Sequence, residues 1–210
     1  MAQGFEREVD GIYRLRVPFE GIYTSVFLIK TEEVRILVDC ATTARDVEDV
    51  ILPALEKMGY APTDIDMLVL TPRHGDHAGG LEALLQHAPQ LAVVTDIRSL
   101  AKGVSTYPMP GHTKDSIGVL DGRTGTLISG DGLQGAGVDK YPCYTQDPGM
   151  YLETLDRIRS DERITSILFS HAYEPFFTDR VSGREQVLSC ITKCYEYTPR
   201  GNDNESNTCK

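Results

Sequence analysis

The sequence predicts an α/β protein, and three observations support this prediction. Runs of β-branched and aromatic residues alternate with segments whose apolar residues recur at helical spacing. Polar, histidine-bearing segments follow several of these runs, where α/β proteins place their functional groups. The 210 residues are 40% hydrophobic and can bury a full core. We expect one domain over residues 1–198 and a polar, disordered tail over 199–210.

The first part of the chain predicts three consecutive strands and a helix. The strands are expected over 11–17, 22–30 and 34–40, which are separated by short polar breaks. The segment ARDVEDVILPALEKMGY (44–60) then carries apolar residues at helical spacing. It predicts an amphipathic helix that bends at Pro53.

The rest of the chain continues the order of strand, polar loop and helix. A strand over 65–71 leads into the loop TPRHGDHAGG, and a helix begins where that loop ends. The short segment IRSLAKG (97–103) is helix-like. Further strands are expected over 91–96, 116–121, 125–131 and 164–171, and further helices over 148–160 and 183–197.

The acidic composition argues against nucleic acid as a partner. The chain has 21 Lys and Arg against 31 Asp and Glu, a net charge of -10, and no basic stripe. It shows no apolar leader and no membrane-spanning run, so we expect a soluble, unexported protein with no membrane partner. Five irregularly spaced cysteines argue against a disulfide framework and favour the cytoplasm. Cys190 and Cys194, on the last predicted helix, are interpreted as packing residues.

Four of the five histidines and two aspartates lie at loop positions close to predicted strand ends. Each alone has an ordinary explanation as a turn former or a hydrogen-bonding group. Together they predict a metal site, because imidazole and carboxylate are ligands that divalent cations select. The fifth histidine, His87, is assigned a structural role. The six candidate residues are His74, Asp76, His77, His112, Asp131 and His171.

Four segments resemble motifs of the metallo-β-lactamase superfamily. TPRHGDHAGG is similar to its T-H-x-H-x-D-H-x-G-G loop, MPGHTKDSIGVL to its PGHTxGS segment, ISGD to its bridging-aspartate strand end, and FSHAYEP to its last-histidine loop. The resemblance covers residues 12–195, with the motifs in the family order. It implies an αββα sandwich of two mixed β-sheets flanked by helices, with metal at their shared edge. Members catalyse many reactions, so the fold does not fix the activity.

Pro72 stands where this family has its first metal-binding histidine. By resemblance, the first site would keep His74 and His112 but lack a third imidazole, because proline has no ligating atom. The second site would keep its full set of ligands, namely Asp76, His77, Asp131 and His171. The resemblance therefore implies one metal per chain in the second site, with zinc preferred and iron or manganese as alternatives.

Two interpretations of the altered site remain open. In the first, His74 and His112 change role from ligands to proton-transfer and oxyanion groups beside Asp76. One lactamase subclass of the family is similar, since it has asparagine in place of the same histidine and uses its second site. In the other, Pro72 only terminates a buried strand, in a catalytically silent protein that binds a metal or ligand.

Several other side chains near the motifs are candidates for substrate contact. Arg73 is a candidate for binding a substrate carboxylate through two parallel hydrogen bonds, whereas Lys114 is interpreted as a solvated loop charge. Asp115 replaces a frequent glycine, which leaves the local turn in question. The aromatic candidates are Tyr141, Tyr144 and Tyr173.

The sequence thus predicts a metal-dependent hydrolase of a small-molecule ester, lactone, thioester or amide, with a silent binding protein as the alternative. The net charge and the lack of an appended domain argue against the nucleases of the family. Loss of the first site argues against its persulfide dioxygenases. The expected partner is a small-molecule substrate, and a homodimer is left open.

Overall fold

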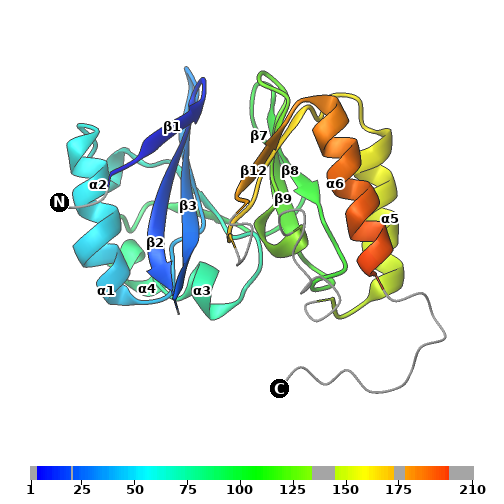
Figure 1. Cartoon of the computed structure of the whole chain (residues 1–210). Coiled ribbons are helices and arrows are strands. Elements are labelled where there is room, and N and C mark those ends of the chain that lie inside the picture. The colour runs from blue at the N-terminus through cyan, green and yellow to red at the C-terminus, as the bar shows by residue number, and fades with distance from the viewer. Residues whose placement is uncertain (1–3, 20, 134–144, 173–177, 199–210) are drawn as a thin grey trace. The chain divides into compact units, whose positions relative to one another are not determined.

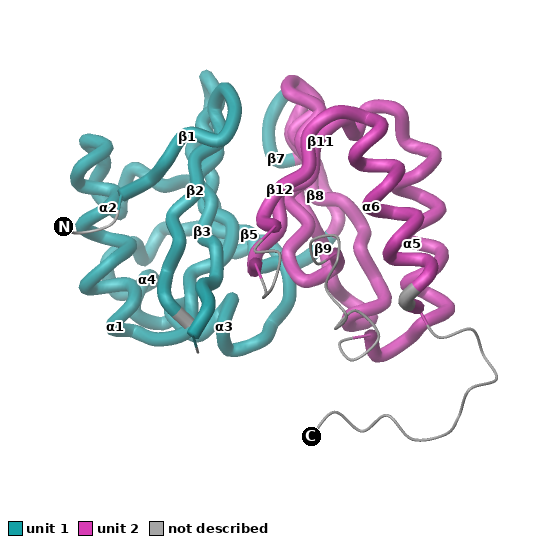
Figure 2. The backbone as a smooth tube through the Cα atoms, viewed as in Figure 1, with its two compact units in different colours: residues 1–96, 100–102 teal, residues 97–99, 103–210 magenta. Residues whose placement is uncertain are grey.

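The computed structural model describes residues 4–19, 21–133, 145–172 and 178–198. The chain divides into two compact units and forms two six-stranded sheets; each unit contains one sheet, except that residues 100–102, which include part of β7 (Ser99–Ala101) in the second sheet, are grouped with the first unit (Figure 1 and Figure 2). The first unit comprises residues 1–96 and 100–102, and the second comprises 97–99 and 103–210. The predicted tail over 199–210 lies outside the described residues.

The sheet of the first unit begins antiparallel and ends parallel. Strands β4, β5 and β6 run in the same direction, with Val38 opposite Val69 and Val69 opposite Val94. Their carboxyl ends therefore meet along one edge of the sheet. In sheet order, the strands are β1 (Glu6–Val9), β2 (Ile12–Phe19), β3 (Ile22–Lys30), β4 (Arg35–Val38), β5 (Met67–Val69) and β6 (Ala92–Val94).

The helix expected after β4 is confirmed, but it contains a π-helical turn where a bend was expected. The N–H of Leu52 bonds to the carbonyl of Val47, one residue further back than in an α-helix. The next residue, Pro53, has no N–H to donate, so the change of helix type directly precedes it. The three parts are α1 (Ala44–Asp46), η1 (Val47–Ile51) and α2 (Leu52–Lys57).

The sheet of the second unit is also mixed. Strands β8 and β10 are both antiparallel to β9, and β10 is parallel to β11, so β8, β10 and β11 point the same way. In sheet order, the strands are β12 (Arg180–Ser182), β11 (Ser166–Leu168), β10 (Thr126–Ile128), β9 (Ile117–Asp121), β8 (Val104–Pro108) and β7 (Ser99–Ala101). The predicted helices are confirmed as α5 (Pro148–Ser160) and α6 (Arg184–Tyr197).

The helix-like interpretation of residues 97–103 is wrong. This segment contains β7, and β8 follows it after a turn in which Gly103 has a φ of 80°. The backbone of Arg98 bonds to Thr106 in both directions, with its carbonyl accepting from the Thr106 N–H at 3.0 Å and its N–H donating to Thr106 Oγ1 at 2.6 Å. Glycine in the left-handed region favours the turn, which the apolar pattern alone did not reveal.

Each unit buries its own apolar core between its sheet and its helices (Figure 1). In the first unit, Leu28 and Leu37 from the strands pack with Ile51 and Leu55 from the helices. In the second, Cys190 and Cys194 are buried with the apolar residues of α5 and α6, which confirms their role in packing. The predicted fold class of two mixed sheets flanked by helices is confirmed. No described helix is long and apolar enough to cross a lipid bilayer.

Candidate metal centre

Polar side chains lie just past the carboxyl ends of the three parallel strands in the first unit. Asp39 follows β4, Thr71 lies just past β5, and Thr95 follows β6. Because these strands are parallel and adjacent, the three residues share one edge of the sheet. The predicted metal-binding segment leaves β5 at this edge.

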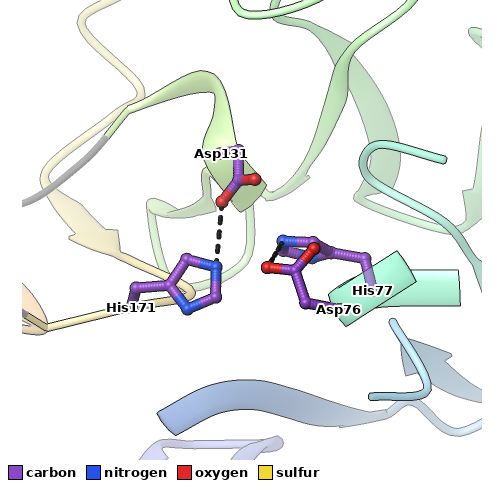
Figure 3. A group of neighbouring side chains, drawn as sticks. All are labelled: Asp76, His77, Asp131 and His171. Atoms are coloured by element: carbon purple, nitrogen blue, oxygen red, sulfur yellow. Dashed lines mark ion pairs between the residues drawn. The ribbon is translucent and has the colours of Figure 1, made fainter. Parts of the chain in front are cut away.

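Asp76 and His77 lie on a short helix where a loop was expected. Helix α3 (Gly75–Ala78) begins after His74, whose carbonyl accepts hydrogen bonds from the N–H groups of His77 at 3.1 Å and Ala78 at 2.9 Å. On this helix, His77 Nε2 lies 3.6 Å from Asp76 Oδ2 (Figure 3). The structure thus corrects the loop assignment and pairs these two residues.

The buried carboxylate of Asp39 orients His77, a contact that the sequence reasoning missed. Asp39 Oδ2 lies 2.7 Å from His77 Nδ1, and both side chains are fully buried. Thr71 fixes the carboxylate by donating its N–H to Oδ1 and its hydroxyl to Oδ2, each at 2.8 Å. With Nδ1 bound to Asp39, the Nε2 atom of His77 faces Asp76. Histidines that bind metals commonly have such a carboxylate on the other ring nitrogen.

The segment from Asp39 to Thr42 is held in a costly conformation. Asp39 has a φ of 63° and Ala41 a φ of 60°, a region that residues with a side chain seldom occupy. Between them, Cys40 donates its N–H and its thiol to the carbonyl of His77, at 2.8 and 3.3 Å. Burial and the nearby charge of Asp39 raise the pKa of Cys40 to about 12. Cys40 therefore remains a thiol that supports His77, and it does not offer a thiolate ligand.

The two glycines that follow α3 allow this close packing. A Cβ atom on Gly79 would lie 1.8 Å from the carbonyl oxygen of Thr42, and one on Gly80 would lie 2.2 Å from that of Cys40. No side chain fits at either distance. The glycine pair of TPRHGDHAGG thus brings α3 into backbone contact with the strained segment that carries Asp39.

In the second unit, Asp131 lies between two histidines. Its Oδ1 atom is 3.2 Å from His171 Nε2 and its Oδ2 atom is 3.4 Å from His112 Nε2. Asp131 and His171 are the third residues after β10 and β11, whose paired ends are Ile128 and Leu168. Figure 3 shows the Asp131–His171 pair. All three side chains are buried. The second unit therefore brings together half of the predicted site residues.

Helix α5 fixes the loop that carries His112. Gly111 has a φ of 135°, and a Cβ atom there would lie 2.6 Å from the Cα of Tyr151 on the helix. The Gly111 carbonyl accepts a hydrogen bond from the N–H of Asp147, the N-cap of α5, at 3.0 Å. Asp115 keeps the local turn that the sequence left in question, because its carboxylate accepts from the Thr113 hydroxyl at 2.9 Å.

The donor atoms within each unit fit a divalent cation. Ligands bound at about 2.0–2.1 Å to a tetrahedral zinc ion lie about 3.3 Å apart. The imidazole–carboxylate distances within the units are 3.2, 3.4 and 3.6 Å. Nitrogen and carboxylate oxygen donors suit zinc, iron and manganese. Pro72 is buried and brings no donor to the segment before His74.

The remaining candidates from the sequence have different surroundings. The exposed Arg73 donates from Nη2 to Thr95 Oγ1 at 3.2 Å, and Lys114 is exposed as expected. His87 Nε2 lies 2.7 Å from Glu48 Oε1, which is consistent with its structural assignment. The three aromatic candidates, Tyr141, Tyr144 and Tyr173, lie outside the described residues.

Sequence relatives of the chain include named hydrolases and lactamase-like proteins. Residues 19–90 match a family model described as the anti-Pycsar protein Apyc1. The hydroxyacylglutathione hydrolase of Xanthomonas axonopodis pv. citri (strain 306) is 29% identical over 140 residues, 59% of this chain and 52% of that protein. The lactamase-like protein adaB of Aspergillus niger is 26% identical over 159 residues, 68% of this chain and 47% of that protein. The chain thus spans about half the length of these relatives.

The fold is similar to that of solved metallo-β-lactamases. The mono-zinc form of FIM-1 from Pseudomonas aeruginosa superposes with a TM-score of 0.72 and 18% identity, covering 94% of this chain and 97% of FIM-1. Such low identity shows a shared fold and leaves the reaction to the residues of the site.

Proposed function

We propose that the chain, which shares the fold of metallo-β-lactamases and is similar in sequence to named hydrolases and lactamase-like proteins, is a member of the metallo-β-lactamase superfamily and a metal-dependent hydrolase of a small-molecule ester, lactone, thioester or amide. The observation that carries this proposal is the orientation of His77. A buried carboxylate, itself fixed by two hydrogen bonds from Thr71, holds one nitrogen of this imidazole while the other faces Asp76. Such an arrangement suits a metal ligand.

We propose that a single cation is held jointly by residues of both units. A tetrahedral zinc ion takes about four ligands, and neither the Asp76–His77 pair nor the Asp131–His171 pair supplies them alone. FIM-1, which has a similar fold, has a mono-zinc form, and this supports the choice of one cation. The absence of a donor at Pro72 supports the choice of the second site. The proposed ligands are Asp76, His77, Asp131 and His171.

A cation held by these four residues would supply a Lewis acid, able to polarise a scissile carbonyl and to make a nearby water more acidic. The protein then has to accept and return a proton. His112 is a candidate for this task because its Nε2 lies 3.4 Å from a carboxylate oxygen of Asp131 and an imidazole can both accept and return a proton. The half-buried His74, which directly precedes α3, is the second candidate. Asp76, the carboxylate before His77 on that helix, is the third.

Metal analysis and a substrate panel test the proposal together. We expect the purified protein to hold about one equivalent of zinc, the number that one complete ligand set can bind. We also expect it to hydrolyse a member of a panel of thioesters, lactones and aryl esters. Asp76→Ala should lose both the metal and the turnover, because it removes one of the proposed ligands.

The matched control is Asp49→Ala, which removes an exposed carboxylate from η1 in the same unit. It should keep wild-type metal content and turnover. Hydrolysis that persists in Asp76→Ala would contradict the mechanism. A protein that takes up no zinc and shows no turnover would support the alternative, a catalytically silent binding protein.

A further inference from the structure

Arg73 lies between Pro72 and His74, and one side of its guanidinium is anchored. Its Nη2 donates a hydrogen bond to Thr95 Oγ1 at 3.2 Å. Thr95 follows β6 at the same sheet edge at which Thr71 follows β5. The side chain of Arg73 therefore runs along the sheet edge that carries the metal-binding segment, from the end of β5 toward the end of β6.

No acidic side chain neutralises Arg73 among the residues that the structure describes. Its hydrogen-bond partner, Thr95, is uncharged, and one hydrogen bond uses only part of the donor capacity of a guanidinium. Other arginines of the same unit do have acidic partners: Arg7 pairs with Asp10, Arg14 with Glu8 and Arg16 with Glu6. In a chain with a net charge of -10, Arg73 thus keeps N–H groups available for an anion from outside.

We propose that Arg73 binds a carboxylate group of the substrate, so that the enzyme acts on carboxylic acids whose hydrolysed bond lies elsewhere in the molecule. This inference rests on the proposed function. A planar guanidinium can donate two parallel hydrogen bonds to a planar carboxylate. A phosphate dianion commonly needs more positive charge, and Arg73 is the single Arg or Lys between Thr71 and Gly80. These facts favour a carboxylate over a phosphate.

Thr95 acts as a positioning residue in this proposal. Its hydroxyl holds Nη2, which limits the rotation of a long and exposed side chain before the substrate arrives. Thr95→Val removes the hydroxyl and keeps the branched shape. We expect this variant to raise the KM for a carboxylate-bearing substrate a few-fold and to leave kcat close to its original value.

The test compares three esters that share a p-nitrophenyl leaving group. They are p-nitrophenyl butyrate, mono-p-nitrophenyl succinate and p-nitrophenyl 3-phosphonopropionate. We expect the zinc-loaded protein to favour the succinate over the butyrate by about tenfold in kcat/KM, mainly through KM, the size expected of a solvent-screened charged hydrogen bond. Arg73→Ala should bring this ratio to about one, and Arg73→Lys should retain part of it because lysine cannot form the paired contact.

Arg45→Ala is the control, because Arg45 is an exposed arginine of α1 outside the proposed site. It should keep the wild-type ratio. A ratio that is the same in the wild type and Arg73→Ala would overturn the proposal. An Arg73-dependent preference for the phosphonate over the succinate would overturn the assignment of a carboxylate.

A separate measurement distinguishes failure of this inference from failure of the hydrolase proposal. If the wild type hydrolyses none of the three esters, the hydrolase proposal fails for this substrate class. Isothermal titration calorimetry with succinate then tests Arg73 directly. Binding that weakens by about tenfold in Arg73→Ala supports the assignment, and equal binding overturns it.

Discussion

A metal-bound imidazole uses only one of its two ring nitrogens, and Asp39 determines which one His77 can offer. We expect Asp39→Asn to weaken zinc binding by about 10- to 100-fold, because an amide holds the ring less firmly and makes its nitrogen less basic. Competition with a chromophoric chelator measures this change. Asp121→Asn is the matched control, since Asp121 is equally buried but pairs with Arg123 in the second unit. A similar loss of affinity in both variants would contradict the orienting role.

In the proposed site, Pro72 is the residue that limits the number of cations to one. Pro72→His restores an imidazole before His74, so we expect zinc content to rise from about one to about two equivalents per chain. Inductively coupled plasma mass spectrometry measures the content. Pro89→His, which places an imidazole at an exposed proline beyond α4 (Leu81–His87), should stay at about one. Unchanged zinc content in Pro72→His would show that the first site is not preformed.

At the scale of elements, the sequence predicted best where the pattern was long. The bounds of α5 match the predicted helix 148–160, because its thirteen residues give several turns of periodicity. Helix α3 has four residues, too few for any periodic signal. Asp39 lies one residue before the end of the predicted strand 34–40, close to a strand end like the candidate ligands. Its contact with His77, 38 positions away in sequence, depends on the pairing of β4 with β5.

The packing of α3 leads to a prediction that compares Gly75, the first residue of the helix, with Gly79, which directly follows it. Gly79→Ala should lower the free energy of unfolding by more than about 2 kcal/mol, because the new methyl group would meet the carbonyl of Thr42. Gly75→Ala should be neutral or stabilise by up to about 1 kcal/mol, because no other atom lies within 4 Å of its Cβ position and alanine favours a helix. Urea denaturation of the metal-free variants measures both. Equal effects would contradict the proposed close approach.

At the scale of the whole molecule, the proposed cation would make the stability of the chain depend on metal. Each unit has its own core, and the proposed ligands come from both. Zinc at about 100 times its dissociation constant stabilises a protein by about 2.7 kcal/mol. For a chain of this length, that corresponds to a rise in Tm of about 5 to 10 °C. Calorimetric scans with zinc and with a chelator should show this difference.

The same calorimetric scans on variants of the proposed ligands test whether both units contribute ligands to the cation. Asp76→Asn changes a ligand in the first unit and Asp131→Asn changes one in the second, so each should abolish most of the zinc-dependent rise in Tm. Asp121→Asn should lower Tm with and without zinc and preserve the difference between them, because Asp121 lies outside the proposed site. If only one of the two ligand variants lost the effect, the cation would be held within a single unit. Loss in both would mean that zinc binding requires a carboxylate from each unit, and that neither unit is a complete metal site by itself.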